Sequence, residues 1–499
     1  MSESVVSFNQ TIRLRPEQRK IFRAYDIRGQ VSVLDEILIT QIAHALAQTY
    51  LEQQQSCVVI GFDARLSSKN YAELMARIFA EQGLDVVEIG CVSSPMLYFT
   101  ASQYQGNGVM ITASHNPISD NGIKWLVQGF APTAEQIQQL ADKIESLDIL
   151  DFPYQKNTKI ANQSRQAEQL YLNYLQQDIQ PNHKFILHVF LDGLNGSAGK
   201  LAEQALQQLA YDFTAFNTNA NGHFPNGSPD PSNAERLLTL QHAIIQAKHH
   251  SDQHCLDEHF VGMVLDGDGD RVVLVDEYGK VVSPDRLLCL LAKIVLQQEI
   301  KSPYKKEILC DVKCSTLLAK VAEKHGATLR MIRTGSSFLR NDLQRSHACF
   351  GGEFAGHYVF NDGRGCGFDD GLYVALRVFE YLQQHHLSLS QALAEFPEHL
   401  ATEDIYIDNQ DIDFHQVITT LKDKAAHQSD VDCCEIDGIR LDFAHGFGLL
   451  RASNTGDYLT LRFDAEHEQA MQQIQQFFID SLADNSTNLV QRIQQKLMI

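Results

Sequence analysis

Three aspartates alternate with glycines at the end of an apolar run in the stretch MVLDGDGDRVVLVD: Asp266, Asp268 and Asp270. Carboxylates about 4 Å apart repel by about 4 kcal/mol per pair at an effective dielectric constant near 20, so three of them cost about 12 kcal/mol together. A hard divalent cation removes this cost, because Mg²⁺ and Ca²⁺ prefer oxygen ligands and glycine lets the backbone fold closely around an ion. The spacing predicts a metal site, with a solvated turn of splayed acidic side chains as the alternative.

The same aspartates admit two further interpretations. An EF-hand needs glycine at its sixth loop position, where this chain has Arg271, and the flanking RVVLV is typical of a strand rather than a helix. An aspartyl phosphatase with Asp266 as nucleophile stays open, although Asp270 stands where that family carries threonine or valine. Nucleotide and esterase interpretations have little support, because GLNGSAGK matches neither a Walker loop nor a Gly-x-Ser-x-Gly elbow.

A second loop, ITASHNPISDNGIKW, carries a hydroxyl, an imidazole and an ammonium on Ser114, His115 and Lys124. It is so rich in Asn, Pro, Ser, Asp and Gly that we expect neither helix nor strand around Ser114. Taken alone, the loop would also suit an ordinary turn, so its meaning depends on the loops that accompany it.

Three more loops combine polar side chains with turn formers. In LLRASNTGDYLTLRF, a guanidinium, two hydroxyls and an amide offer what a phosphate dianion needs, on Arg451, Ser453, Asn454 and Thr455. In CFGGEFAGHYVF, Glu353 can accept hydrogen bonds from sugar hydroxyls, and His357 can donate or carry a proton. The segment IFRAYDIRG reads by itself as a salt-bridged turn. Each of these loops has a purely structural alternative when it is taken alone.

The elements that position these loops alternate between short β-branched runs and longer amphipathic stretches. Strand-like CVVIGF is followed by helix-like SSKNYAELMARIFAEQG and strand-like VVEIG, and the rhythm restarts twice, at FILHVFLDGLNG and EILCDVKCS. Such βαβ order predicts α/β domains with mixed, mainly parallel sheets. After Pro397, shorter strands mix with helices expected at 414–427 and 465–483, which favours a smaller α+β domain. We therefore expect four domains, at residues 1–158, 159–278, 279–396 and 397–499.

Length, charge and cysteine content narrow the class of protein. A chain of 499 residues is long enough for about three or four domains. Its 41 basic and 62 acidic residues give a net charge of −21, which disfavours nucleic acid and anionic membranes as partners. The sequence shows no signal peptide and no long apolar run, so we expect a cytoplasmic protein. Its ten cysteines suggest reduced, mostly buried thiols.

One polar segment is expected to be a surface loop. The stretch AKHHSDQHCLDEH at 247–259 contains four histidines, but their spacing does not follow a regular metal-ligand pattern. A metal site is therefore the less favoured interpretation of this segment.

The five loops, in this order along the chain, resemble the α-D-phosphohexomutase family, and above all its bacterial phosphomannomutase/phosphoglucomutase branch. TASHNP and DGDGDR on successive domains are the most specific signals, and GEFAGH and RASNT follow them. The resemblance spans about Phe22 to Ala465. It implies four domains around a central cleft, with the first three α/β domains sharing a topology and each domain contributing one loop to the cleft.

The resemblance also implies roles for individual residues. It implies that Ser114 carries a phosphoryl group and that one Mg²⁺ per chain is bound by Ser114, Asp266, Asp268 and Asp270. Catalytic roles are implied for Ser114, His115, Lys124, Arg28, Arg271 and His357. Substrate binding is implied for Tyr25, Arg286, Lys313, Glu353, Ala355, Arg451, Ser453, Asn454 and Thr455.

The chemistry implied is an intramolecular phosphoryl transfer between C1 and C6 of a hexose monophosphate, mannose or glucose. Phosphoserine 114 gives its phosphoryl group to the free sugar hydroxyl, and the hexose 1,6-bisphosphate turns round and returns its other phosphate. The same bisphosphate is expected to act as activator. Mg²⁺, Arg271 and Lys124 would neutralise the transferred charge. The base that accepts the hydroxyl proton is left open among Lys124, His357 and Arg28 acting with a neighbour.

Departures from the family pattern bear on the choice of sugar. The chain has Phe354 and Ala355 where relatives commonly read Gly-Glu-Met-Ser-Gly-His, and the missing hydroxyl removes a hydrogen bond worth roughly 0.5 to 1.5 kcal/mol. Ser336 stands where relatives have a histidine in the cleft, and Gly456-Asp457 where they often have Thr-Pro.

Several alternatives stay open beside the mutase. They are a phosphoglucosamine mutase, a metal-dependent sugar phosphatase working through Asp266, and an inactive ligand-binding relative. We expect sugar phosphates as ligands, and a monomer or possibly a dimer. A hinge at 396–402 is expected to let the last domain close over the cleft, because the site must exclude water while the intermediate reorients.

Overall fold

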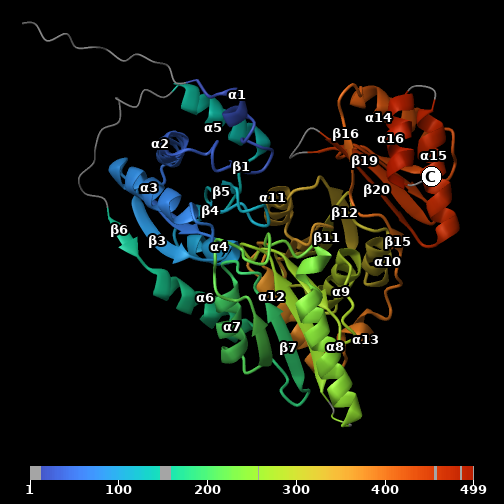
Figure 1. Ribbon diagram of the computed structural model, residues 1–499, viewed down its shortest axis with the longest axis horizontal. Coiled ribbons are helices and arrows are strands. Elements are labelled where there is room, and N and C mark those ends of the chain that lie inside the picture. The colour runs from blue at the N-terminus through green and yellow to red at the C-terminus, as the bar shows by residue number, and fades with distance from the viewer. Residues whose placement is uncertain are drawn as a thin grey trace, which may run out of the picture. The chain divides into compact units, whose positions relative to one another are not determined.

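The computed structural model describes residues 13–146, 159–254, 256, 258–453, 458–483 and 486–497 (Figure 1). The chain divides into two compact units. The first comprises Met1–Asp178, Leu191–Leu238 and Val264–Asp270, and the second Ile179–Phe190, Thr239–Met263 and Arg271–Ile499.

The first unit contains a six-stranded mixed sheet in the order β1-β5-β4-β2-β3-β6. Strand β2 runs parallel to β3 and β4, β3 runs parallel to β6, and β5 runs antiparallel to β1 and β4. The strands are β1 (Ile27–Gln30), β2 (Cys57–Phe62), β3 (Asp85–Cys91), β4 (Gly108–Ile111), β5 (Asp120–Leu126) and β6 (Ile160–Asn162). The helices of this part are α1 (Pro16–Arg19), α2 (Glu36–Glu52), α3 (Ser68–Glu81), α4 (Ser94–Ser102), α5 (Ala134–Ser146) and α6 (Ser164–Asp178).

Helix α2 shows why this sheet acquires a core. Asp35 caps its first turn, because the carboxylate accepts a hydrogen bond from the Leu38 backbone N–H at 2.9 Å. Leu38, Ile42 and Leu46 recur every fourth residue and are fully buried, so they form one apolar stripe. The stripe belongs to a cluster that includes Val58 of β2 and residues of α3 and α5. Helix packing therefore fixes the strands that carry the serine loop.

A second sheet has the order β10-β9-β7-β8. Its strands are β7 (Leu187–Asp192), β8 (Asp212–Phe216), β9 (His259–Leu265) and β10 (Val272–Val275). Helix α7 (Gly199–Gln208) and a short 3₁₀ turn, η2 (Ala234–Arg236), lie in the first unit, and α8 (Leu238–Gln253) leads into β9. The acidic loop leaves the carboxyl end of β9, where a nearly fully buried strand stops at Leu265.

The second unit contains a mixed sheet in the order β12-β11-β13-β14, in which β11 is parallel to β12 and β13. Its strands are β11 (Lys305–Asp311), β12 (Thr328–Ile332), β13 (Ala348–Gly352) and β14 (Tyr358–Phe360). The helices are α9 (Pro284–Leu296), α10 (Leu317–Lys324), α11 (Ser336–Ser346), α12 (Gly371–His385) and α13 (Leu389–Leu393).

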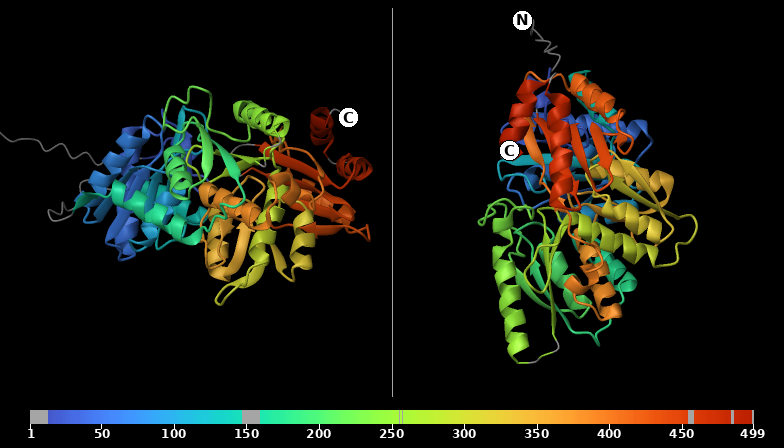
Figure 2. Two further views of the ribbon diagram at one scale, coloured as in Figure 1. Left: turned by 90° about the horizontal axis from the view of Figure 1, so that it is seen from below. Right: turned by 90° about the vertical axis from the view of Figure 1, so that its right-hand side faces the viewer.

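An antiparallel sheet in the order β15-β20-β19-β18-β17 completes the second unit, and β16 also pairs with β20. Its strands are β15 (Leu400–Ala401), β16 (Ile405–Asp408), β17 (Asp432–Cys434), β18 (Ile439–Phe443), β19 (Gly446–Ala452) and β20 (Tyr458–Ala465). Helices α14 (Phe414–Ala425), α15 (Glu468–Leu482) and α16 (Thr487–Leu497) share one apolar core with it, and Figure 2 shows α15 against the strands in its right-hand view.

The alternation of strands and helices confirms the predicted α/β domains followed by a smaller α+β domain. The domain borders at residues 158, 278 and 396 stay a prediction. Among the described residues, no helix is both long and apolar enough to cross a membrane.

Three predictions about local structure were wrong. Residues 247–253 belong to helix α8 rather than to a loop, because Leu240, Ile244 and Ser251 are buried and the polar residues, including the histidines, cover the other faces. The helix expected from Ala465 begins at Glu468, because Ala465 still pairs with Gly446 in the sheet. The described cysteines are free as expected, but only four of them are buried: Cys289, Cys310, Cys314 and Cys349.

Candidate active site

The serine loop occupies residues 112–119 between β4 and β5, outside helix and strand as predicted. Ser114 is only 3% exposed and has φ of +51°, a left-handed conformation that costs energy for a residue with a side chain. Its Oγ donates a hydrogen bond to Asp266 Oδ2 at 2.7 Å and lies 3.2 Å from His115 Nδ1. The structure therefore brings the predicted serine directly against the acidic loop.

The acidic loop approaches Ser114 through its first glycine. A Cβ atom on Gly267 would lie 2.4 Å from the Ser114 carbonyl oxygen, so only glycine permits this approach. Carboxylate oxygens of Asp266, Asp268 and Asp270 lie within 4.8 Å of one another, and all three residues are buried. They are not splayed into solvent, which rules out that alternative for the loop.

The donor set fits a hard divalent cation. Asp268 accepts hydrogen bonds at Oδ2 from Ser94 Oγ at 2.5 Å and from Lys124 Nζ at 2.7 Å. Its other oxygen, Oδ1, is buried and has no hydrogen-bond partner among the described residues. Buried carboxylate oxygens are the ligands that Mg²⁺ and Ca²⁺ take up, and a buried oxygen without a donor is one that a cation would satisfy.

Lys124 of β5 ends between two of these carboxylates. Its ammonium lies 2.7 Å from Asp268 Oδ2 and 2.6 Å from Asp270 Oδ2. Burial works against the charged form, yet the two carboxylates outweigh it and raise the pKa of Lys124 above its ordinary value. The pKa of Asp268 moves the other way, because Lys124 outweighs the effect of burial and lowers it.

The side chain of Arg28 of β1 contacts the serine loop. Its Nη1 donates to Asn116 Oδ1 at 3.2 Å and its Nη2 to Asp26 Oδ2 at 2.6 Å, so the predicted salt-bridged turn is present. Burial opposes the charge of Arg28, but Asp26, Tyr25 and Asp268 together outweigh burial and raise the pKa of the guanidinium. Tyr25 lies half-buried in the bend before β1.

The predicted sugar loop connects β13 and β14 in the second unit. Glu353 is 1% exposed, and its carboxylate accepts a hydrogen bond from the Gly335 backbone N–H. Burial, together with the negative charge of Asp311, raises the pKa of Glu353 to about 7. His357 Nδ1 lies 2.8 Å from Asp369 Oδ2.

Arg271 joins the sugar loop through its backbone and side chain. It forms an isolated β-bridge with His357, and its Nη1 lies 3.4 Å from the Ala355 carbonyl oxygen. Its guanidinium therefore contacts the loop that was predicted to recognise the sugar.

Two predicted substrate-binding cations contact the segment from Leu393 to Asp404. Lys313 is 6% exposed and donates to Asp404 Oδ2 at 2.9 Å. Burial is the largest single effect and lowers the pKa of Lys313, but Asp404 and Asp311 together outweigh it, so the net shift is upward. Arg286 of α9 donates to the carbonyl oxygens of Phe396 at 3.0 Å and Leu393 at 2.8 Å. Arg286 thus holds the segment that leads into the expected hinge, together with the first residue of that hinge.

The predicted phosphate loop is only partly within the described residues. Arg451 of β19 is buried, and its Nε donates to Asp437 Oδ2 at 2.9 Å. The Ser453 backbone N–H bonds to the Tyr458 carbonyl at 2.9 Å. Asn454 and Thr455 lie outside the described residues.

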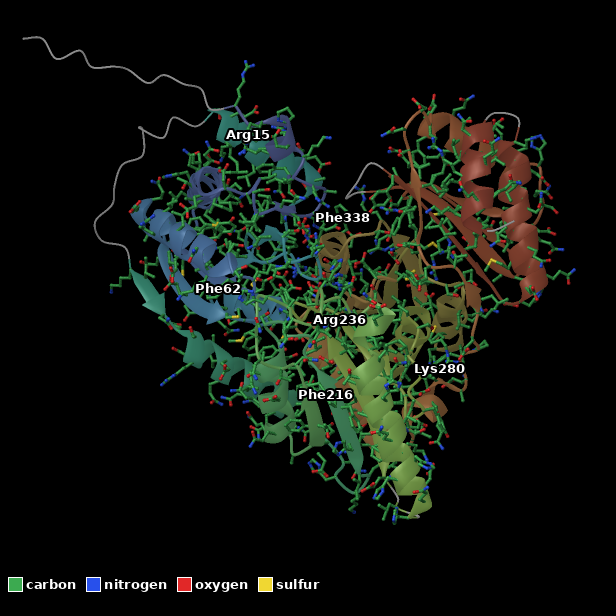
Figure 3. All side chains as sticks on the ribbon, in the orientation of Figure 1. Arg15, Phe62, Phe216, Arg236, Lys280 and Phe338 are labelled. Carbon is green, nitrogen blue, oxygen red and sulfur yellow. The ribbon has the colours of Figure 1, made fainter. Side chains whose placement is uncertain are left out.

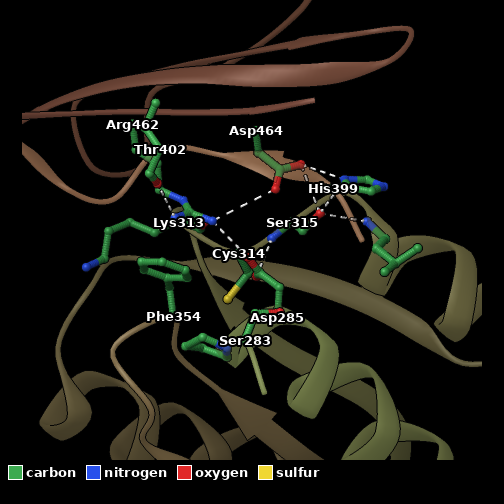
Figure 4. Close-up of polar contacts among 12 residues, drawn as sticks. Ser283, Asp285, Lys313, Cys314, Ser315, Phe354, His399, Thr402, Arg462 and Asp464 are labelled. Atoms are coloured by element: carbon green, nitrogen blue, oxygen red, sulfur yellow. Dashed lines mark hydrogen bonds and ion pairs between the residues drawn. The ribbon is translucent and has the colours of Figure 1, made fainter. Parts of the chain in front are cut away.

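A buried polar network, shown in Figure 4, connects the last sheet with the preceding α/β sheet. Arg462 of β20 is fully buried and donates to Asp285 Oδ2 at 2.7 Å and to the Thr402 carbonyl at 2.9 Å. Its guanidinium carbon lies 3.4 Å from the centre of the Phe354 ring, a cation–π contact with the sugar loop. Burial raises the pKa of Asp285 to about 6 despite Arg462.

The same network contains a serine, a histidine and an aspartate that do not form a nucleophilic triad. Ser315 Oγ and Asp464 Oδ1 both lie at the same nitrogen of His399, Nδ1, at 3.1 and 2.8 Å. A triad needs the two partners on different ring nitrogens. The hydrogen bond that His399 donates to Asp464 raises the pKa of His399, so this cluster is a structural ion pair.

Sequence reasoning missed several residues of these sites. Ser94, which binds Asp268, gave no signal, because the two lie 174 residues apart. Asp63 and Arg65, which hold the serine loop, did give a sequence signal, because they follow the parallel strand β2. Side chains at the carboxyl ends of neighbouring parallel strands lie close together. Arg462 and Asp285 lie in segments without a motif.

The fold, together with the site formed by the serine loop and the acidic loop, defines an α/β enzyme. In it, a loop hydroxyl faces a carboxylate cluster suited to a cation. Comparison with known families makes this specific. Models described as phosphoglucomutase/phosphomannomutase, alpha/beta/alpha domains I, II and III match residues 19–150, 169–279 and 283–400. The chain belongs to the phosphoglucomutase/phosphomannomutase family, within the α-D-phosphohexomutases, and is an isomerase.

Individual relatives agree with this placement over nearly the whole chain. A phosphomannomutase/phosphoglucomutase of Pseudomonas syringae is 35% identical over 92% of this chain and 94% of its own length. A phosphoglucomutase of Neisseria meningitidis is 34% identical over 95% and 98%. The crystal structure of a phosphoglucomutase/phosphomannomutase family protein from Burkholderia thailandensis superposes with a TM-score of 0.82 at 31% identity, covering 93% of this chain and 97% of that one.

Proposed function

We propose that this enzyme interconverts hexose 1-phosphate and hexose 6-phosphate, with mannose or glucose as the sugar, through a phosphoserine at position 114. The observation that carries the proposal is the 2.7 Å hydrogen bond between Ser114 Oγ and Asp266 Oδ2, which sets a hydroxyl against a carboxylate cluster suited to a cation. The names of the relatives support the class of substrate.

In the proposed reaction, the phosphoryl group leaves Ser114 Oγ and forms a new P–O bond with the free hydroxyl oxygen of the sugar monophosphate. The hydroxyl proton passes to a base, and Ser114 Oγ recovers a proton when the bond to phosphorus breaks. The resulting hexose 1,6-bisphosphate reorients, and its other phosphate returns to Ser114 by the same exchange in reverse. Because the two half-reactions use one serine, the enzyme ends each cycle phosphorylated, and added bisphosphate would activate unphosphorylated enzyme.

Positive groups of this chain would neutralise the charge that spreads over the transferred phosphoryl oxygens. Lys124 stands beside the acidic loop, and Arg28 binds Asn116 of the serine loop. His115 Nδ1 lies 3.2 Å from the reacting oxygen and can exchange a proton with it. The identity of the base stays open among Lys124, His357 and Arg28 with a neighbour.

Asp266, Asp268 and Asp270 would hold one Mg²⁺ together with the Ser114 oxygen. Bound there, the ion would stabilise negative charge on the phosphoryl oxygens. The buried position and the unpartnered oxygen of Asp268 support this assignment.

Further side chains would bind the rest of the substrate. Glu353 would accept hydrogen bonds from sugar hydroxyls, and Arg451 and Ser453, with Asn454 and Thr455, would bind the phosphate that is not being transferred. Lys313, Ala355, Arg286 and Tyr25 complete the proposed substrate-binding set, whereas Arg271 and His357 belong to the proposed catalytic residues. Arg286 has the weakest support, because its donors already bind two backbone carbonyls.

A matched pair of serine variants tests the proposal. Ser114→Ala should lower the turnover of mannose 1-phosphate and glucose 1-phosphate by at least about 1,000-fold, because the nucleophile is gone. Ser119→Ala removes an exposed hydroxyl from the same loop and should leave turnover unchanged. Full activity of Ser114→Ala would refute the proposal. A phosphoenzyme cleaved by hydroxylamine would instead indicate an acyl phosphate on Asp266.

A further inference from the structure

The guanidinium of Arg65 contacts the serine loop, although Arg65 lies 49 residues before Ser114 in sequence. It follows β2, whose last residue, Phe62, is labelled in Figure 3. The side chain is almost fully buried, at 1% exposure. A guanidinium is strongly polar, so its burial requires that nearly every N–H find an acceptor.

The acceptors of Arg65 are the backbone carbonyls of the serine loop. Nη2 donates to the carbonyl oxygens of Ser114 at 2.9 Å and Asn116 at 2.6 Å. Nη1 donates to those of Pro117 at 2.6 Å and Asp120 at 2.9 Å. One side chain thus fixes four carbonyls across the whole loop, from the reacting serine to the first residue of β5.

Asp63 closes this arrangement into a ring around Ser114. Its Oδ2 accepts from Arg65 Nε at 3.2 Å and from Thr112 Oγ1 at 2.7 Å. Thr112 Oγ1 in turn accepts from the Ser114 backbone N–H at 2.8 Å. Both backbone groups of Ser114 are therefore held, its carbonyl by Arg65 and its N–H by Thr112.

This ring acts where the backbone is strained. Ser114 has φ of +51°, a conformation that a serine keeps only if its surroundings hold it. A second segment shields the ring: Arg65 forms a parallel β-bridge with Gly222, and its guanidinium carbon lies 5.5 Å from the Phe224 ring centre. With water excluded, no solvent hydrogen bond replaces a carbonyl contact that is lost.

We propose that Arg65 is a positioning residue for phosphoryl transfer, which holds the serine loop so that Ser114 Oγ points at Asp266. The inference rests on the proposed function, because it presumes that Ser114 is the group phosphorylated. The hydrogen bonds of the Arg65 side chain go to backbone carbonyls and to Asp63, not to the reacting oxygen. It acts by keeping the reacting oxygen in line, and a displacement of about 1 Å at such a position costs on the order of 100-fold in rate.

Two variants and one control test this inference. Arg65→Lys keeps the charge but cannot reach four carbonyls, because an ammonium is a compact point charge on a single stem. Thr112→Val removes the other arm of the ring with little change of volume. Arg377→Lys is the matched control, because Arg377 is fully buried and binds Asp362 and Tyr373, neither of which is a predicted site residue.

The measurements are kcat and KM for glucose 1-phosphate well below each variant's Tm, and the rate at which hexose 1,6-bisphosphate phosphorylates Ser114, followed by intact mass. Arg65→Lys should lower kcat and the phosphorylation rate on the order of 100-fold, and Thr112→Val about 10-fold, with KM within about threefold of wild type. Arg377→Lys should lower Tm without lowering kcat.

The inference is overturned if Arg65→Lys or Thr112→Val, folded, keeps kcat within about threefold of wild type. It is also overturned if Arg377→Lys loses as much kcat as Arg65→Lys while the two variants lose the same amount of Tm. If Arg65→Lys does not fold, Thr112→Val decides. Failure of the proposed function would look different, because wild type itself would then carry no phosphate on Ser114.

Discussion

Replacing Glu353 by glutamine should change the pH dependence of stability in a defined direction. The carboxyl is 1% exposed, and its pKa is raised from 4.5 to about 7, first by burial and then by Asp311, against the opposing effects of His357, Gly335 and Lys313. Glutamine keeps the shape and can still accept the Gly335 hydrogen bond, but it does not titrate.

The sign follows from proton binding in the two states. Below pH 4.5 the carboxyl is protonated in both the folded and the unfolded chain, so its contribution to stability is fully present. Between pH 4.5 and about 7 only the folded chain keeps the proton, so stability falls as pH rises. The difference between about 7 and 4.5, at about 1.36 kcal/mol per pKa unit, corresponds to a loss on the order of 3 kcal/mol.

The assay is urea unfolding of wild type and Glu353→Gln across this pH range. Wild type should lose on the order of 3 kcal/mol relative to the variant as pH rises to about 7. Glu398→Gln is the control, because a hydrogen bond from Lys280 lowers the pKa of Glu398 and its contribution is lost as pH falls, the opposite direction. Parallel curves for wild type and Glu353→Gln would refute the reasoning.

Three further predictions concern Asp268 of the acidic loop, Lys124 beside it, and the buried ion pair between Arg462 and Asp285. Asp268→Asn should raise the Mg²⁺ concentration for half-maximal activity at least about 10-fold, and an unchanged Mg²⁺ titration would contradict the assigned site. Lys124→Met should lower kcat by about 100-fold or more with little change in KM, whereas a loss confined to KM would show a binding role only. Arg462→Met leaves buried Asp285 without its cation and should cost about 3 to 5 kcal/mol in unfolding free energy by urea titration, while a change below about 1 kcal/mol would show that Asp285 is neutral or hydrated in the native state.

Much of the fold could be predicted because the pattern is local. Strand β2 lies where β-branched residues cluster, and helix α3 lies where apolar residues follow an amphipathic period. The observed ends of such helices differ from the predicted ends by only a few residues. Helix α8 was missed because its last turns are so polar that composition suggested a loop. The three apolar or small residues that bury one side of it recur too sparsely to reveal the helix.

The candidate site could be predicted only as far as motifs reach. Ser114 and Asp266 belong to short recognisable segments, and the structure places their oxygens in contact. Ser94 binds a distant carboxylate, and nothing in its local sequence announces that partner. Arg65 binds backbone carbonyls, and its only signal is its position after the parallel strand β2. Stacking of Arg462 on Phe354 is likewise a tertiary contact, 108 residues apart in the chain, that no spacing rule predicts.

The most direct test follows one phosphoryl group. Enzyme labelled with isotopic phosphate is digested to locate the label, and a second portion is mixed with unlabelled glucose 1-phosphate for a single turnover. We predict that the label sits on Ser114 and passes into hexose 1,6-bisphosphate before any inorganic phosphate appears. Label on Asp266, or direct release of labelled inorganic phosphate without the bisphosphate, would contradict the account.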